Sequence, residues 1–91
     1  MSRLIAATAK TRKRTDPVDG DRVRKRSLTL SGHRTSVSLE DAFWDALNDI
    51  ASERGMSITA LVSEVDEARG VTALSQSLRA YALNWYRGKT R

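Results

Sequence analysis

The sequence predicts a mainly α-helical fold that opens with one short β-strand and continues through three helices. Residues 35–39 alternate polar and apolar side chains, which is the period of a half-buried strand. Gly55 and Gly70 divide the apolar residues further along into separate helices. The apolar residues directly after the strand recur at the spacing of one helical face: Phe43, Trp44, Leu47, Ile50 and Ala51.

Length and composition limit the class of protein. The 91 residues include no Cys and one His, which excludes disulfides and thiolate zinc sites and makes an imidazole metal cluster unexpected. No apolar run approaches the roughly 18 residues of a membrane helix, and residues 4–9 are too short an apolar stretch for a secretory signal. We therefore expect a cytoplasmic protein with no membrane span, metal or cofactor.

Positive charge is concentrated at the N-terminus. Residues 1–26 hold nine Lys/Arg and three Asp, a net charge of +6, whereas residues 27–91 hold seven Lys/Arg and eight Asp/Glu, a net charge of −1. We predict a disordered basic arm over residues 1–26 that adds salt-sensitive affinity for a polyanion, with a solubilising tail as the alternative. Its cations are Lys10, Arg12, Lys13, Arg14, Arg22, Arg24, Lys25 and Arg26.

The folded domain is predicted over residues 27–91. About 65 residues form a marginal core, so homodimerisation is expected on size alone. The strand at residues 35–39 also needs a partner for its backbone groups, and we favour the same strand of a second copy, paired antiparallel. An intrachain hairpin is the rival, because residues 27–30 also alternate and residues 31–34 have the length and the glycine of a hairpin loop.

The first two predicted helices have recognisable ends. Glu40 and Asp41 suit the positive N-terminal end of the first helix, and Gly55 suits the left-handed position that ends it. Ser57 can cap the second helix, which should end near residues 69–70. The second helix continues the core with Ile58, Leu61, Val62 and Val65.

A third helix is predicted to begin at Thr72 as N-cap and to end before Gly88. Near its end stand Trp85 and Tyr86, which we expect to cover the core of a dimer. The alternative is an exposed aromatic pair that binds a protein partner. The helix carries its larger side chains on adjoining faces: Leu74, Leu78, Tyr81, Ala82, Trp85 and Tyr86.

Residues 34–68 resemble the ribbon-helix-helix (MetJ/Arc-like) family of prokaryotic DNA-binding regulators. The alternating strand, the amphipathic first helix and the Gly55-Met56-Ser57 link carry the resemblance. The stretch SGHRTSVSLEDAFWDAL is similar to a bacterial subgroup with a GHRTSxxLE opening and an extra C-terminal helix. The resemblance implies an intertwined homodimer with an intermolecular antiparallel β-ribbon, followed here by the third helix.

The resemblance also implies a DNA site. Arg34, Ser36 and Ser38 on the solvent face of the strand would read bases, because Arg binds guanine O6 and N7 in a bidentate way and Ser hydroxyls donate or accept. Phosphates would be contacted by backbone N–H groups at the start of the second helix and by the loop histidine. These phosphate-contacting residues are Met56, Ser57, Ile58 and His33.

The expected function is therefore a sequence-specific, DNA-binding transcriptional regulator of repressor type, located in the nucleoid. Its partners would be double-stranded DNA and a second copy, with higher assembly on tandem sites. The alternative is an antitoxin or adaptor that holds a protein through the third helix, with DNA binding secondary. No nucleophile with a base, metal cluster or phosphate loop is visible in the sequence, so an enzyme is not expected.

Overall fold

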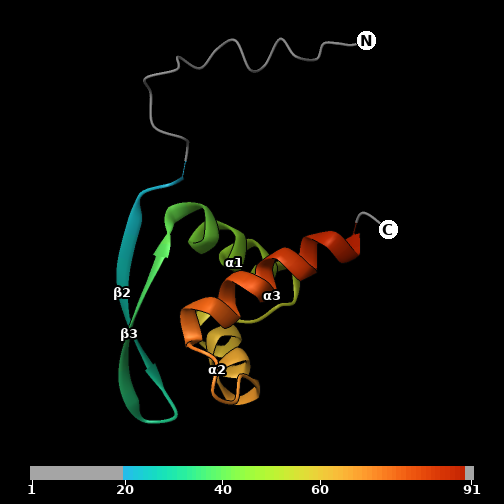
Figure 1. Cartoon of the computed structure of the whole chain (residues 1–91). Coiled ribbons are helices and arrows are strands. Elements are labelled where there is room, and N and C mark those ends of the chain that lie inside the picture. Colours follow the sequence, from blue (N-terminus) through green and yellow to red (C-terminus); the bar gives the residue numbers. More distant parts are fainter. Residues whose placement is uncertain (1–19, 90–91) are drawn as a thin grey trace, which may run out of the picture.

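The computed structural model describes residues 20–89, so the predicted arm cations at 10–14 lie outside the described residues. A β-hairpin lies along one side of three packed helices (Figure 1). Its strands are β2 (Val23–Leu30) and β3 (His33–Glu40), and the helices are α1 (Asp41–Glu53), α2 (Ile58–Ala68) and α3 (Leu74–Lys89). None of these helices is long and apolar enough to cross a membrane.

The strand finds its partner within the chain. β3 pairs antiparallel with β2 in a register that runs from Leu30↔His33 to Val23↔Glu40. Ser31 and Gly32 take φ values of 51° and 83°, which makes a two-residue type I′ turn whose twist matches that of the strands. The intrachain hairpin, which was the rival to pairing between copies, is therefore formed, because so short a loop closes at little entropic cost. Pairing of β3 with the same strand of a second copy stays a prediction.

The folded region also begins earlier in the chain than the predicted boundary at residue 27. β2 begins at Val23, four residues before the boundary predicted from composition, and so includes Arg24, Lys25 and Arg26. These charged residues show no apolar alternation in the sequence. They nevertheless form a strand because β3 supplies hydrogen-bonding partners for their backbone groups.

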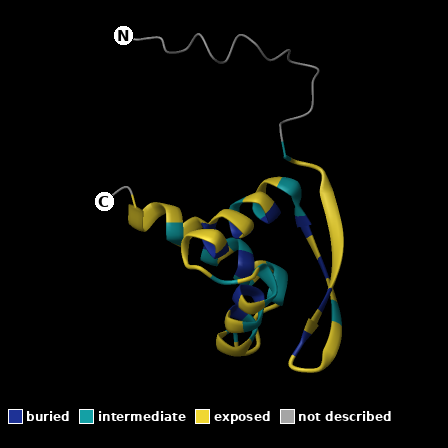
Figure 2. Cartoon of the chain, turned by 180° about the vertical axis from the view of Figure 1, so that it is seen from behind, coloured by how far each residue is buried: buried dark blue, intermediate teal, exposed yellow. Residues whose placement is uncertain are grey.

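The core lies between the hairpin and the helices. One face of the hairpin is buried against them and the other is exposed (Figure 2). Every buried side chain among the described residues is apolar. The hairpin contributes Leu28, Leu30, Val37 and Leu39, and the helices contribute Trp44, Leu47, Ile50, Ala51, Leu61, Val62, Val65, Leu78 and Ala82.

The ends of the helices confirm most of the predicted boundaries. Gly55 has φ 71° just after α1, and the Ser57 hydroxyl accepts a 3.0 Å hydrogen bond from the Ala60 N–H at the start of α2. Both predicted ends of the third helix are wrong: α3 begins at Leu74, so Ala73 and not Thr72 directly precedes it, and it continues through Gly88 to Lys89. Its last turn is held by the Lys89 ammonium, which lies 2.7 Å from a Glu53 carboxylate oxygen and 5.6 Å from the centre of the Trp85 ring.

Ion pairs join neighbouring elements at the surface. The Arg79 guanidinium lies 3.0 Å from the Glu40 carboxylate and joins α3 to the end of β3, and its hydrogen bond lowers the pKa of Glu40. The Arg54 guanidinium donates to Glu64 at 2.8 Å and to the Tyr81 hydroxyl at 2.9 Å. The bond from Arg54 lowers the pKa of Glu64. These contacts fasten α1 to α2 and α3 around the core.

Candidate nucleic-acid interface

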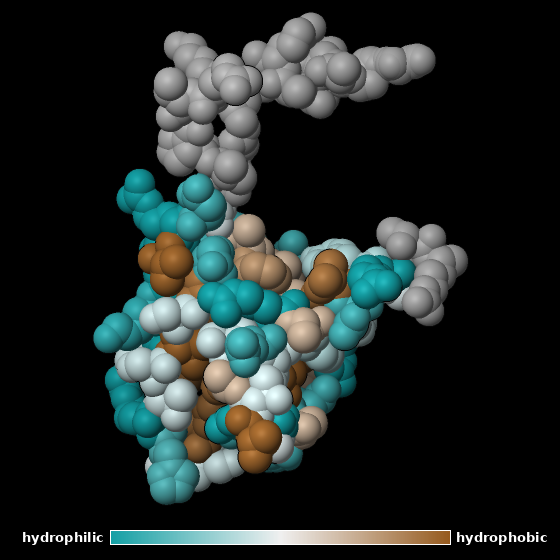
Figure 3. All heavy atoms as spheres, viewed as in Figure 1, coloured by the Kyte–Doolittle hydropathy of each residue, from teal (hydrophilic) through white to brown (hydrophobic). Residues whose placement is uncertain are grey.

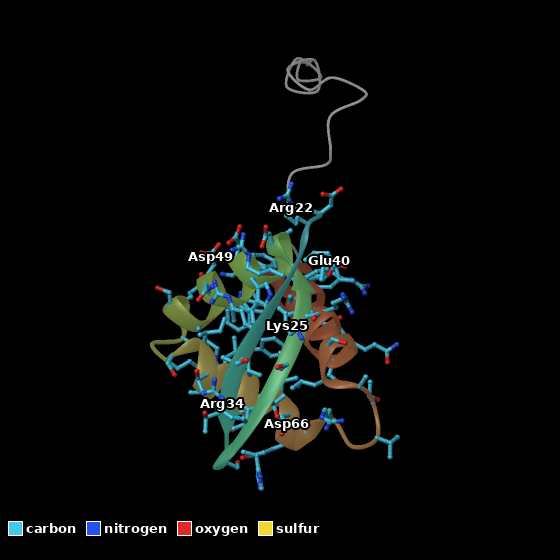
Figure 4. The ribbon with its side chains drawn as sticks, turned by 90° about the vertical axis from the view of Figure 1, so that its left-hand side faces the viewer. Arg22, Lys25, Arg34, Glu40, Asp49 and Asp66 are labelled. Atoms are coloured by element: carbon cyan, nitrogen blue, oxygen red, sulfur yellow. The ribbon has the colours of Figure 1, made fainter. Side chains whose placement is uncertain are left out.

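The exposed face of the hairpin brings the predicted base-contacting residues together. Because residues opposite each other in an antiparallel pair share a face, Arg34 lies beside Thr29, Ser36 beside Ser27 and Ser38 beside Lys25. All six are exposed. We call Lys25, Ser27, Thr29, Arg34, Ser36 and Ser38 the outer face, and Figure 4 shows Lys25 and Arg34 on the hairpin side that is turned to the viewer.

The outer face offers hydrogen-bonding groups without a carboxylate. Lys25 donates only, Arg34 donates through a rigid fork, and the four hydroxyls donate or accept. The Ser27 and Ser36 hydroxyl oxygens lie 3.5 Å apart across the two strands. A two-stranded ribbon fits the B-DNA major groove, which is about 12 Å wide. The surface therefore has both the width and the chemistry of a major-groove reader.

Sequence reasoning missed half of this surface. Charge alone places Lys25 in the basic arm, and the sequence alone gives Ser27 and Thr29 no role. The missing signal is the register, because only the pairing of β2 with β3 shows which β2 residues lie beside Arg34, Ser36 and Ser38. Two features of the sequence do indicate the pairing of β2 with β3: the alternation of residues 27–30 and the glycine at position 32.

The chain also matches a known protein family. The family described as the ribbon-helix-helix domain matches residues 23–86. The chain belongs to the ribbon-helix-helix family. It is also similar to a solved structure, that of an uncharacterized protein from Bordetella pertussis Tohama I, with 31% identity and a TM-score of 0.72 over 98% of this chain and 72% of that chain. A comparison with curated proteins gives no match.

In this ribbon-helix-helix chain, two of the cations predicted to contact DNA also contact residues of α1. The Arg24 guanidinium lies 2.8 Å from the Asp41 carboxylate, and their hydrogen bond lowers the pKa of Asp41. Arg26 lies 5.3 Å from the centre of the Trp44 ring. The Trp44 indole N–H in turn donates to the Arg24 carbonyl at 2.9 Å. Arg24 and Arg26 therefore hold β2 against α1, and Arg22, just before the strand, stays exposed.

The start of α2 offers a set of free N–H groups shifted by one residue from the predicted set. The Met56 N–H already donates to the Ala51 carbonyl at 2.9 Å, so it is not available to a phosphate. The Ala60 N–H is taken by the Ser57 hydroxyl. Within residues 20–89, the N–H groups of Ser57, Ile58 and Thr59 have no acceptor, and these are the groups that a helix N-terminus can present to an anion.

His33 lies at the turn end of the hairpin. It is exposed and pairs with Leu30 directly beside the two-residue turn. Arg34 follows it in β3, and the two side chains point to opposite faces of the hairpin. By the register His33 shares the face of Leu30 and not that of the outer face, so its contact with a phosphate stays a prediction.

Proposed function

We propose that this chain is a sequence-specific regulator of transcription, of repressor type, that inserts its own β-hairpin into the major groove of double-stranded DNA. The observation that carries the proposal is the outer face, where Arg34, Ser36 and Ser38 lie beside Thr29, Ser27 and Lys25 on a ribbon two strands wide. Membership of the ribbon-helix-helix family supports it. On this proposal the protein acts in the bacterial nucleoid as a homodimer on repeated half-sites.

Each part of the outer face has a distinct role in this proposal. Arg34 reads guanine through a bidentate pair, and the serines and threonine adjust to several bases through their hydroxyls. Lys25 and Arg22 lie near the phosphates at the other end of the hairpin and contribute affinity without sequence preference. The N–H groups of Ser57, Ile58 and Thr59 are the expected clamp on a flanking phosphate, in place of the set that included Met56.

Selection of genomic DNA fragments by the purified protein at near-physiological salt tests this function. We expect enrichment of a short repeated motif. Arg34→Ala should then weaken binding to that motif by about 1 to 3 kcal/mol while changing binding to unrelated DNA much less.

Arg69→Ala is the matched control, because it removes the same charge from the end of α2, where Arg69 pairs with Asp66. It should leave the ratio of specific to non-specific affinity unchanged. Equal loss of specific binding in both variants would refute base reading by Arg34. Retention of DNA without any shared motif would refute sequence-specific regulation.

A further inference from the structure

An apolar groove between α1 and α3 is open to solvent. Its volume is about 350 Å³, and Figure 3 shows apolar side chains gathered over these helices, to the right of the hairpin in that view. On α3, Leu83 is 57% exposed and Tyr86 is 39% exposed. An apolar surface of this kind is typical of a site where another segment binds. The α1 wall consists of Ala42, Phe43 and Ala46, and the α3 wall includes Ala82, Leu83 and Tyr86.

Residues 1–19 join the described fold at one end of this groove. The Gly20 carbonyl accepts a 2.9 Å hydrogen bond from the N–H of Ala42, which lines the groove. The two residues are so close that a Cβ on Gly20 would lie 2.8 Å from the Ala42 Cβ. The chain therefore enters the fold against the first turn of α1.

The chain before Gly20 is long enough to return to the groove. The eleven steps from Ala9 to Gly20 span about 17 to 20 Å on average in a flexible chain, and about 36 Å when fully extended. Helix α1, with 13 residues, is about 20 Å long. A segment that ends at Ala9 therefore reaches the groove without being stretched.

Residues 4–14, which we call the arm segment, have a composition that suits this surface. The first six residues of the segment, LIAATA, are apolar except for one Thr, and their large side chains are Leu4 and Ile5. Four cations follow directly: Lys10, Arg12, Lys13 and Arg14. The arm segment thus joins an apolar part to a basic part, and it lies outside the described residues.

The α1 rim of the groove is acidic. Asp45 and Asp49 are exposed and form no ion pair within residues 20–89. Because residues three and four apart are neighbours on a helix, these carboxylates lie beside Ala42 and Ala46. Figure 4 shows Asp49 at the end of the molecule where Arg22 lies, which is the end where residues 1–19 join the fold. An apolar groove with free carboxylates beside it is complementary to the arm segment.

We propose that the arm segment of the same chain docks on the α1–α3 groove when no DNA is bound. Leu4 and Ile5 lie against the two helices, and the cations at 10–14 lie beside Asp45 and Asp49. Burial of the aliphatic side chains gives an attraction that persists in salt, whereas salt weakens the attraction between the charges. Since both partners belong to one chain, their effective concentration is high and weak contacts are sufficient.

DNA then competes with α1 for the cations of the arm segment. This step rests on the proposed function. A cation held beside Asp49 cannot contact a phosphate at the same time, so docking lowers the affinity for DNA of any sequence. The outer face, which reads bases, is left free. Docking of the arm segment therefore opposes non-specific binding more than specific binding.

A spin label on residue 2 tests the docking without DNA. The sequence has no cysteine, so Ser2→Cys gives the full chain a single labelling site. We expect the label to broaden the NMR signals of the Ala46 and Leu83 N–H groups much more than that of Gly32. Gly32 lies in the hairpin turn, at the opposite end of the molecule from α1 (Figure 1). Equal broadening of all three signals would overturn the proposal, and so would broadening that arises only from labels on other chains in a mixed sample.

Substitutions on either side of the apolar contact should abolish this broadening. The double variant Leu4→Ser with Ile5→Ser changes the arm segment without changing its charge, and Leu83→Ser changes the groove. Val71→Ser is the control, because Val71 is fully exposed between α2 and α3 and lies outside the groove. Circular dichroism checks that each variant keeps its fold. Broadening that survives Leu83→Ser, or that is lost in Val71→Ser, would overturn the proposal.

Binding to a duplex of unrelated sequence measures the competition. Asp49→Asn should raise the affinity by up to about tenfold, the factor expected when the arm segment is docked in about nine-tenths of the molecules. Glu67→Gln is the control, since it removes an exposed carboxylate of α2 that forms no ion pair with the described residues. In the Leu4→Ser and Ile5→Ser chain, Asp49→Asn should have no such effect. An equal gain in both backgrounds would show direct repulsion between Asp49 and DNA and would overturn the competition.

The docking and the proposed function fail separately. The broadening at Ala46 and Leu83 is measured without DNA, whereas base reading is measured with Arg34→Ala. A docked arm segment in a protein that selects no DNA motif would refute the proposed function and leave the docking standing. Sequence-specific binding by a protein that shows no such broadening would refute the docking alone.

Discussion

Proline substitutions at two neighbouring positions of β3 should have very different effects on stability. The residues that flank the turn, Leu30 and His33, form a hydrogen-bonded pair, and such pairs alternate along the strands. Thr35 therefore donates its N–H to Leu28 within the hairpin, whereas the Ser36 N–H points away from β2. The bond from the Asp41 N–H to the Arg22 carbonyl, 2.8 Å long, fits the same alternation beyond the end of β3.

The magnitude follows from this geometry. Thr35→Pro removes one backbone hydrogen bond, worth about 0.5 to 1.5 kcal/mol, and leaves a carbonyl beside the core without its partner, at about 1 to 3 kcal/mol. We expect a loss of about 2 to 4 kcal/mol in the free energy of unfolding. Ser36→Pro removes no hydrogen bond within the hairpin and should cost about 1 kcal/mol or less. A domain of this size has roughly 4 to 10 kcal/mol in total.

Urea unfolding followed by far-ultraviolet circular dichroism measures both values. Thr35→Val and Ser36→Ala are the controls, since they change the side chains and keep the backbone N–H groups. Equal losses for the two prolines, or a larger loss for Ser36→Pro, would refute the reasoning that the Ser36 N–H has no hydrogen-bonding partner. Such a result would instead favour a ribbon in which the Ser36 N–H is bonded to another strand.

Three other outcomes are expected. Gly32→Ala should cost about 1 kcal/mol of folding free energy, because an L side chain is strained at φ 83°, whereas Ser31→Gly should be neutral or slightly stabilising; urea unfolding would measure both, and a neutral Gly32→Ala would contradict the type I′ turn. Arg54 lowers the pKa of Glu64 below its ordinary value of 4.5, so this pair stabilises the fold above that pH and ceases to do so as the pH falls through the lowered pKa. Glu64→Gln should therefore reduce the acid dependence of unfolding below about pH 4.5, and an unaltered dependence would show that the pair contributes nothing. Deletion of residues 1–19 should flatten the dependence of DNA affinity on salt, and an unchanged slope would show that these cations do not contact DNA.

The candidate site was predictable only in part. Alternation along residues 35–39 is enough to place Arg34, Ser36 and Ser38 on one face, because side chains of a strand alternate whatever its partner is. The contribution of β2 was not predictable from Lys25 or Ser27 themselves, since their face depends on which strand lies alongside. The contacts of Arg24 and Arg26 were not predictable for the same reason: without the register, nothing in the sequence places them beside Asp41 and Trp44.

By itself, the sequence determined the three helices and the boundary between α1 and α2. Apolar spacing, the cap at Ser57 and the glycine at 55 are local signals, and they produce the same elements in any tertiary context that buries the apolar faces. Family membership followed from the same local pattern. Only the tertiary structure decided that β3 pairs within its own chain, that α3 extends past Gly88, and that an apolar groove lies open between α1 and α3. These features depend on contacts between residues distant in the sequence, where pairing and packing outweigh local preference.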